Sequence, residues 1–235
     1  QIFDQDSGSV TFEVTQKLDF ELELGTVIGS NLPVGETLDF KGAEDLIFGY
    51  VLLNDWSARD IQSWEYQPLG PFLSKSFGTS ISPWIITPEA LEPFKTKTPE
   101  RKFKLLPHFE DDKAFVFDIS LNVTLIEEDG AQTKITETNS KELYYSTVQQ
   151  VIHHASAGSG LSTGDLMGSG TISGTEEGSF GCMLELSWGG KEKIVLNSGN
   201  KRDFLEDNDI IVFSGSAMED NFTIGFGSCS GRIVK

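Results

Sequence analysis

Cysteine is scarce in this 235-residue chain, which contains only Cys182 and Cys229. Two cysteines are too few for a disulfide-held scaffold, and they lack metal-ligand spacing, so we expect two buried thiols. Long apolar runs are lacking as well: none approaches the ~18–20 residues that a membrane-spanning helix requires. The sequence therefore excludes disulfide-rich secreted domains and proteins with membrane-spanning helices, and no membrane partner is expected.

Positive charge is also in short supply. The chain carries 18 Lys and Arg against 36 Asp and Glu, a formal net charge of −18, which repels phosphate backbones and argues against a nucleic-acid partner. Apolar material is sufficient for a packed interior, with 38% hydrophobic residues and 17 Phe. We expect an acidic globular protein of the cytoplasm. Because the chain starts at Gln1 without Met or a signal-peptide pattern, we expect part of a longer polypeptide.

Periodicity predicts a strand-rich α+β fold, with one domain over residues 1–235. Apolar and polar residues alternate over 11–24, the period-2 pattern of a half-buried strand. The unbroken apolar run 50–53 fits a strand that is buried on both faces. Residues 115–126 and 132–138 flank an acidic turn with glycine and predict a hairpin.

The second half of the chain contains the clearest helical pattern. Apolar residues recur at helical spacing from Tyr144 to Ala155, and we expect Asn139 to cap this helix and Gly158 to end it. Shorter elements complete the expected order: a helical stretch over 42–47, strands over 84–86, 182–188, 193–196, 210–214 and 222–226, and irregular segments over 67–83 and 94–113.

Glu21 and Glu23 are the first candidates for chemistry. Residues i and i+2 of a strand lie on one face, roughly 6.5–7 Å apart. Both carboxylates, which would share that face with Asp19, can therefore reach a single cation. The alternative is a solvated polar face, which is common in so acidic a protein.

Asp55 ends an apolar strand where the chain enters a loop, a position at which a rigid element can hold a carboxylate at the edge of a cavity. A helix is expected to follow. On it, Arg59, Gln62 and Tyr66 would share one face, so that a cation, an amide and a phenol point together near Asp55.

Ser57 and Asp60 resemble a capping box that starts this helix. The residues around it also allow an interpretation without function. Arg59 could instead pair with Asp60 or Glu65 in a buried polar corner that has no function.

Other candidates depend more on context. Lys75 could stabilise an oxyanion and Thr79 could offer an oxygen to a hard cation, but their loop lacks the P-loop spacing and a plain surface lysine is more common. Glu185 alternates with apolar neighbours in an expected strand, where it could orient a histidine, bind a cation or form a surface salt bridge. His153 and His154 are adjacent and cannot grip one metal together, so we interpret them as helix-end residues. No nucleophile elbow occurs.

Several strings stand in a fixed order along the chain: ELE at 21–23, NDWSARDIQ at 54–62, WEY at 64–66, PLGPFL at 68–73, KSFGT at 75–79, ISPW at 81–84, SGTISG at 169–174 and MLELSW at 183–188. Together they resemble the fumarylacetoacetate hydrolase family. The long block 54–84 resembles its fumarylacetoacetase branch more than the wider superfamily.

The resemblance implies a catalytic domain built as a mixed β-roll and β-sandwich, which forms homodimers and binds Ca²⁺ or Mg²⁺, with Mn²⁺ as a further candidate. Glu21, Glu23 and Asp55 match acidic ligands of the metal. Lys75 and Thr79 match positions that line a neighbouring Mg²⁺ site.

The resemblance also implies hydrolysis of the C–C bond of a diketo acid, 4-fumarylacetoacetate, to fumarate and acetoacetate in tyrosine and phenylalanine catabolism. Glu185 matches the carboxylate that orients a general-base histidine. The groups that stabilise oxyanion charge are matched by Arg59, Gln62 and Lys75. Substrate contacts are matched by Gln62, Tyr66 and Thr171.

In the family, the catalytic histidine, a further Asp ligand and a small N-terminal domain lie upstream of the Glu-x-Glu strand. The residues before Glu21 include no His. We therefore expect the C-terminal portion of a longer enzyme. Two alternatives stay open: another superfamily reaction, such as acylpyruvate hydrolysis or oxaloacetate decarboxylation, and a non-catalytic dimerising fragment.

Overall fold

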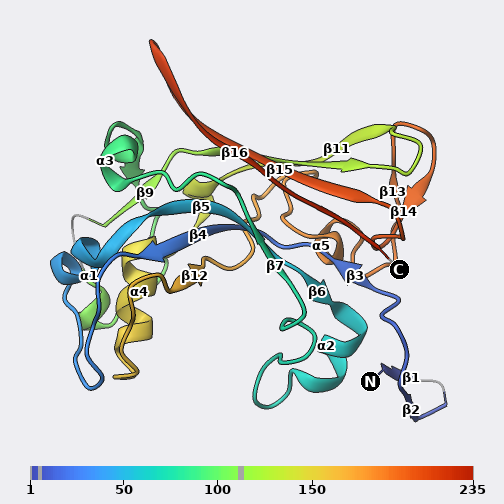
Figure 1. Cartoon of the computed structure of the whole chain (residues 1–235), viewed down its shortest axis with the longest axis horizontal. Helices are drawn as coiled ribbons and strands as arrows, with labels where there is room; N and C mark the ends of the chain where they lie inside the picture. Colours follow the sequence, from blue (N-terminus) through green and yellow to red (C-terminus); the bar gives the residue numbers. More distant parts are fainter. Residues whose placement is uncertain (1, 5–6, 111–113, 235) are drawn as a thin grey trace.

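Two curved antiparallel sheets form most of the molecule (Figure 1), whose computed structural model describes residues 2–4, 7–110 and 114–234. One sheet has the strand order β12-β4-β5-β7 and the other β11-β10-β15-β16. The strands of the first are β4 (Leu22–Ile28), β5 (Ile47–Asp55), β7 (Thr79–Ile81) and β12 (Leu166–Gly168). Those of the second are β10 (Ser120–Ile126), β11 (Gln132–Asn139), β15 (Ile210–Glu219) and β16 (Phe222–Arg232). The expected strand-rich α+β class is confirmed.

Short strand pairs and helices complete the fold. The pairs are β1 (Ile2–Asp4) with β2 (Ser9–Thr11), β3 (Leu18–Asp19) with β6 (Ser57–Ala58), β8 (Lys95–Lys97) with β9 (Phe115–Phe117), and β13 (Ile194–Val195) with β14 (Lys201–Arg202). The helices are α1 (Phe40–Leu46), α2 (Arg59–Glu65), α3 (Pro88–Leu91), α4 (Thr147–Ala155) and α5 (Met183–Leu186). None of these helices is long and apolar enough to cross a membrane, a finding that covers the described residues.

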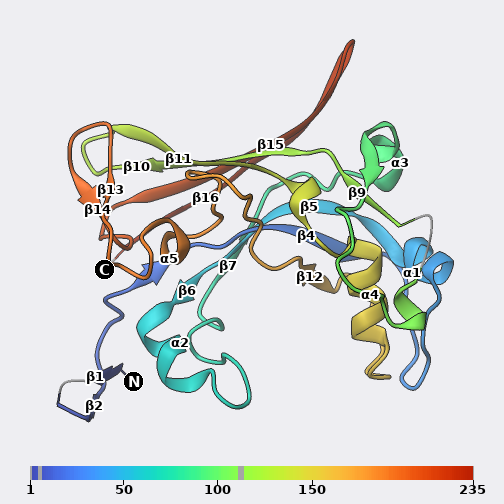
Figure 2. The ribbon, with the colours of Figure 1, turned by 180° about the vertical axis from the view of Figure 1, so that it is seen from behind.

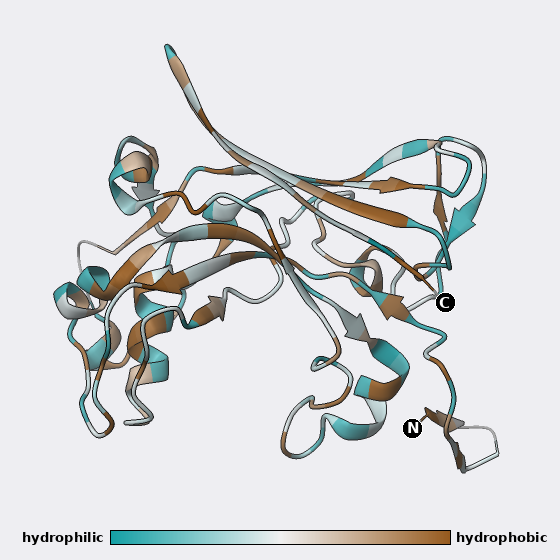
Figure 3. Ribbon diagram, viewed as in Figure 1, coloured by the Kyte–Doolittle hydropathy of each residue, from teal (hydrophilic) through white to brown (hydrophobic). Residues whose placement is uncertain are grey.

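The core lies where the two sheets face each other, and the ribbons of both sheets contain hydrophobic stretches (Figure 3). Phe20 meets Phe213 of β15 edge to face, with ring centroids 5.6 Å apart. Glycine allows close approach at two points. A Cβ on Gly215 would lie 2.8 Å from Leu52, and one on Gly231 would lie 2.5 Å from the Trp56 ring. The strand that carries Asp55 therefore packs closely against the second sheet.

The expected strand over 11–24 is wrong in extent. The chain forms β2, β3 and β4 there, and Phe12 and Val14, expected in the core, are 92% and 73% exposed. From Asp19 to Leu24 both parities are buried, because the chain enters the interior and residues on each side of it are covered. The strand over 50–53 is part of β5 and is buried on both faces, as predicted.

Three local predictions in the second half also need correction. Within residues 182–188, expected as a strand, Met183–Leu186 form the short helix α5. Helix α4 begins at Thr147 and its capping box joins Ser146 to Gln149, whereas Asn139 caps the 3₁₀ turn Ser140–Glu142.

Of the remaining local predictions, the strand over 84–86 is wrong, because this segment makes only an isolated bridge from Ile86 to Tyr50. The hairpin of β10 and β11 is confirmed. The irregular segment over 94–113 contains the short strand β8, and its residues 111–113 lie outside the described residues.

Phe213→Ala is expected to lower the free energy of unfolding by about 3–5 kcal/mol, because it leaves a cavity between the sheets. Phe12→Ala is the matched control: its ring is exposed, and the change should stay within about 0.5 kcal/mol. Urea unfolding followed by circular dichroism measures both. Equal losses in the two variants would contradict this placement of the core.

Candidate metal centre and active site

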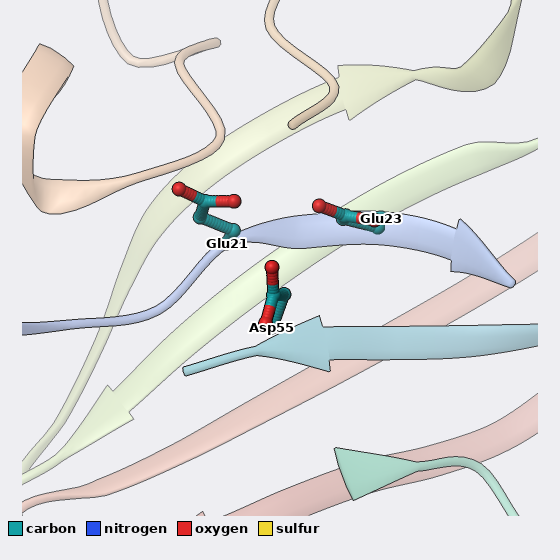
Figure 4. A group of neighbouring side chains, drawn as sticks. All are labelled: Glu21, Glu23 and Asp55. Atoms are coloured by element: carbon teal, nitrogen blue, oxygen red, sulfur yellow. The ribbon is translucent and has the colours of Figure 1, made fainter. Parts of the chain in front are cut away.

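Three carboxylates meet beside the β4–β5 pair: Glu21, Glu23 and Asp55 (Figure 4). Each offers an oxygen that lies within 4.8 Å of an oxygen of the other two. Glu23 belongs to β4, Glu21 directly precedes it, and Asp55 ends the neighbouring β5. The antiparallel register sets Leu22 opposite Asn54, which brings the acidic residues of the two strands together. The predicted convergence of Glu21 and Glu23 is thus confirmed, and Asp55 joins them.

The alternative of a solvated polar face is wrong for these glutamates. Glu21 and Glu23 are only 9% and 4% exposed. Glu21 is tied to β5, since its N–H donates to the side-chain Oδ1 of Asn54 at 3.1 Å and its carbonyl accepts from Asp55 N–H at 3.3 Å. Buried carboxylates need compensating partners, which makes their surroundings informative.

Two cations compensate Glu21. Lys75 Nζ lies 2.6 Å from Glu21 Oε2 and 2.8 Å from Asp55 Oδ2, and Arg59 Nη1 lies 2.6 Å from Glu21 Oε1. Burial alone would raise the pKa of Glu21, but the hydrogen bond from Lys75 and the charges of Arg59 and Lys75 outweigh it and lower the pKa. Lys75 is therefore no plain surface lysine.

Compensation is weaker at Glu23, where the charge of Lys75 lowers the pKa by less than burial and the neighbouring acids raise it. Its Oε2 accepts a hydrogen bond from Gly170 N–H at 3.1 Å. Burial, followed by the charges of Glu21 and Asp55, raises the pKa of Glu23 to about 8. An excess of buried negative charge on hard oxygen donors fits a divalent cation of the Ca²⁺, Mg²⁺ or Mn²⁺ kind. Thr79, predicted beside such an ion, lies directly opposite Asp55 in the β5–β7 pair.

Arg59 starts α2 and is held by a buried network. Its Nε donates to Asp19 Oδ2 at 2.8 Å, and its Nη1 also donates to Gln62 Oε1 at 2.9 Å. The same Asp19 accepts hydrogen bonds from the backbone N–H groups of Met183 and Leu184, at 2.7 and 3.0 Å. From the sequence, Asp19 was expected only as a neighbour of Glu21 and Glu23 on one strand face. The pattern that could have singled it out is an acidic residue between two apolar ones, Leu18 and Phe20.

Two predictions about the start of α2 are wrong. The helix is preceded by Ala58 without a side-chain cap, because Asp60 instead accepts hydrogen bonds from Thr15 Oγ1 and the backbone N–H of Gln16. Arg59 pairs with neither of the acids considered on its own helix. Glu65 is occupied by the 72–74 backbone and the Ser74 hydroxyl.

The remaining candidates lie around this network. Gln62 contacts Arg59, as predicted from their spacing, whereas Tyr66 is 47% exposed at the end of α2. Thr171 lies in the glycine-rich turn after β12, next to Ile172, whose N–H donates to Leu22 C=O at 2.8 Å. Glu185 lies on α5, and one of its oxygens, Oε2, accepts from Ser173 Oγ at 2.7 Å and from Cys182 Sγ at 3.1 Å. Their chemical roles stay predictions.

The cysteines and the paired histidines are as expected. Cys182 and Cys229 are free and buried, and burial raises the pKa of both thiols, that of Cys229 to about 11. His153 and His154 are exposed in the last turn of α4. They line a pocket of about 800 Å³ that does not include the three carboxylates.

The pKa of Glu23 gives a pH prediction for the metal-free chain. Its folded pKa of about 8 exceeds the ordinary 4.5, so the folded chain binds more protons than the unfolded chain between these values. The free energy of unfolding should fall as pH rises through this window, by at most about 1.4 kcal/mol per pH unit from this group. Glu23→Gln should remove that component in denaturant titrations with chelator at pH 5, 6, 7 and 8. An unchanged slope would contradict the assignment.

Comparison with known proteins identifies relatives of the whole chain. A family model described as fumarylacetoacetate (FAA) hydrolase C-terminal matches residues 5–234. The fumarylacetoacetase of Arabidopsis thaliana is 48% identical over 232 residues, which cover 98% of this chain and 55% of the relative. That of Bos taurus is 46% identical over 235 residues, with 100% and 56% covered. The chain thus spans about half the length of the curated relatives it matches.

Solved structures share the fold. A fumarylacetoacetate hydrolase from psychrophilic Exiguobacterium antarcticum has a TM-score of 0.58 and 19% identity, and the match covers 99% of this chain and 60% of that one. A fumarylpyruvate hydrolase from Pseudomonas aeruginosa, in complex with Mn²⁺ and pyruvate, has a TM-score of 0.57 and 17% identity, with 95% and 69% covered. These likenesses concern the fold alone. By the match of its sequence to the family model, this chain belongs to the fumarylacetoacetate hydrolase C-terminal family.

Proposed function

We propose that this chain is the C-terminal catalytic portion of a metal-dependent hydrolase that cleaves the C–C bond of 4-fumarylacetoacetate to fumarate and acetoacetate. The observation that carries the proposal is the buried carboxylate triad with Arg59 and Lys75 converging on it. The names of the relatives, fumarylacetoacetase at 48% and 46% identity, support the choice of substrate.

Glu21, Glu23 and Asp55 would hold a divalent ion, Ca²⁺ or Mg²⁺ in the first instance, with Thr79 and Lys75 beside it. When bound, the ion supplies Lewis-acid chemistry: it polarises a carbonyl oxygen and stabilises an enolate. The Mn²⁺ complex of the structurally similar fumarylpyruvate hydrolase makes Mn²⁺ a third candidate.

The side chains of this chain have three tasks in the reaction. Arg59, Gln62 and Lys75 bind oxygens on which negative charge develops. Tyr66 and Thr171 contact the substrate. Ser173 and Cys182 both donate to Oε2 of Glu185. The other oxygen, Oε1, can therefore accept a hydrogen bond from the N–H of a general-base histidine in an upstream segment.

The bond changes balance with water as the only co-reactant. The histidine takes a proton from water, the hydroxide adds to one carbonyl carbon, and the C–C bond breaks. The electron pair leaves as the enolate of acetoacetate, which then takes up the proton. The attacked carbonyl carbon becomes the new carboxyl group of the other fragment, which releases its proton to solvent and leaves as fumarate.

A local cationic site is required because the product fumarate is a dianion and the chain has a net charge of −18. Local field rather than net charge governs binding at such a site. Arg59 and Lys75 are the cations held there, each by an ion pair with Glu21. A homodimer and a cytoplasmic location stay predictions.

Glu185→Gln tests the function. In the complete polypeptide that carries this chain, the variant should lower kcat for fumarylacetoacetate by about 10²–10⁴-fold, since an amide cannot stabilise an imidazolium. Loss of the diketone absorbance measures the rate, and Glu177→Gln, an exposed acid outside the site, is the control. If the wild type decarboxylates oxaloacetate or hydrolyses acylpyruvates but does not turn over fumarylacetoacetate, the proposed substrate is wrong and the other superfamily reaction takes its place. Turnover of none of them would favour the non-catalytic alternative.

Glu23→Gln tests the metal site. Removing one charged ligand should weaken Ca²⁺ or Mg²⁺ binding at least about 10-fold by calorimetry, because hard cations depend on the charge of their oxygen ligands. Glu92→Gln, which changes an exposed acid paired with Lys95, should leave the affinity unchanged. Equal affinity of wild type and Glu23→Gln would rule out this triad as the site.

A further inference from the structure

We propose that Asp19 is a positioning residue of the reaction: through one buried carboxylate it sets the orientation of Arg59 and the location of α5, which carries Glu185. The inference rests on the proposed function, because that function gives Arg59 and Glu185 their roles. Asp19 itself is fully buried and cannot contact a substrate.

The geometry on the Arg59 side fixes the guanidinium plane. Asp19 Oδ2 accepts from Nε at 2.8 Å, while Glu21 Oε1 and Gln62 Oε1 accept from Nη1 at 2.6 and 2.9 Å. A planar group held at two nitrogens has no rotational freedom left. Nη2 makes no hydrogen bond within the described residues, so it is the nitrogen left to bind an anionic oxygen.

The same carboxylate of Asp19 also fixes the position of α5. Asp19 Oδ1 accepts from Met183 N–H at 2.7 Å and Oδ2 accepts from Leu184 N–H at 3.0 Å. These are N–H groups of the first helical turn, which have no partner inside the helix. Glu185 follows directly. A shift of this short helix would move the carboxylate of Glu185, and a misplacement of about 1 Å can reduce a rate about 10²-fold.

Asp19 therefore links two groups that approach the site from distant parts of the sequence, α2 and α5. An amide at this position has a single acceptor oxygen. It cannot serve Arg59 Nε and both backbone N–H groups, and its NH₂ would face a donor. Asp19→Asn keeps the shape of the side chain and removes this link.

The chain offers a matched control in a second buried Asp–Arg pair. Asp209 is 1% exposed, accepts from Arg202 Nε and Nη2 at 3.0 and 3.1 Å, and also accepts from Glu206 N–H at 2.9 Å. No candidate site residue takes part in these contacts. Asp209→Asn therefore imposes a comparable structural loss without touching Arg59 or α5.

The experiment compares Asp19→Asn with Asp209→Asn in the complete polypeptide at saturating Ca²⁺, at a temperature where both are folded. Both should lower Tm. Only Asp19→Asn should lower kcat for fumarylacetoacetate, by about 10–100-fold with KM within about threefold, because the affected contacts act on developing charge. A double variant with Glu185→Gln should lose less than the product of the two single losses.

The outcomes distinguish failure of the proposed function from failure of the role of Asp19. Absence of wild-type turnover would overturn the proposed function. Wild-type turnover with unchanged kcat in Asp19→Asn, or an equal fall in both Asn variants, would overturn only the role of Asp19. If Asp19→Asn does not fold, Asp19→Glu keeps the charge but adds one methylene, and unchanged kcat there would equally overturn it.

Discussion

Burial of carboxylates in one short segment is the constraint on which the site depends. Asp19, Glu21 and Glu23 all lie inside the protein, where an unpaired charge costs several kcal/mol. Arg59 forms ion pairs with Asp19 and Glu21, and Lys75 forms a further ion pair with Glu21. Glu23 is left with a backbone N–H and a raised pKa, which is the property that a divalent cation would relieve.

The elements around the segment follow from these pairings. β5 continues through β6 into α2, so that Arg59 enters the interior beside β3, and the loop before β7 returns to place Lys75 between Glu21 and Asp55. The end of β12 lies close to Glu23, since a Cβ on Gly168 would lie 2.2 Å from Glu23 Oε2. Figure 2 shows the same arrangement from behind, with α2 and α5 near each other at one end of the β4–β5 pair.

The arrangement also reconciles an acidic protein with an anionic substrate. A net charge of −18 is a property of the surface as a whole, whereas Arg59 and Lys75 are held at the site itself. In a partly buried setting such cations act over short distances and are weakly screened.

The sequence by itself determined the fold class, the β10–β11 hairpin and the buried strand β5, because these depend on local period, and the order of its motifs named the candidate site residues. It did not determine that Met183–Leu186 form a helix, that Ser146 caps α4, or that Phe12 is exposed. Those depend on which distant residue supplies a partner or a cover. Asp19 is the clearest case: its two backbone donors lie at 183 and 184, and only tertiary structure brings them to it.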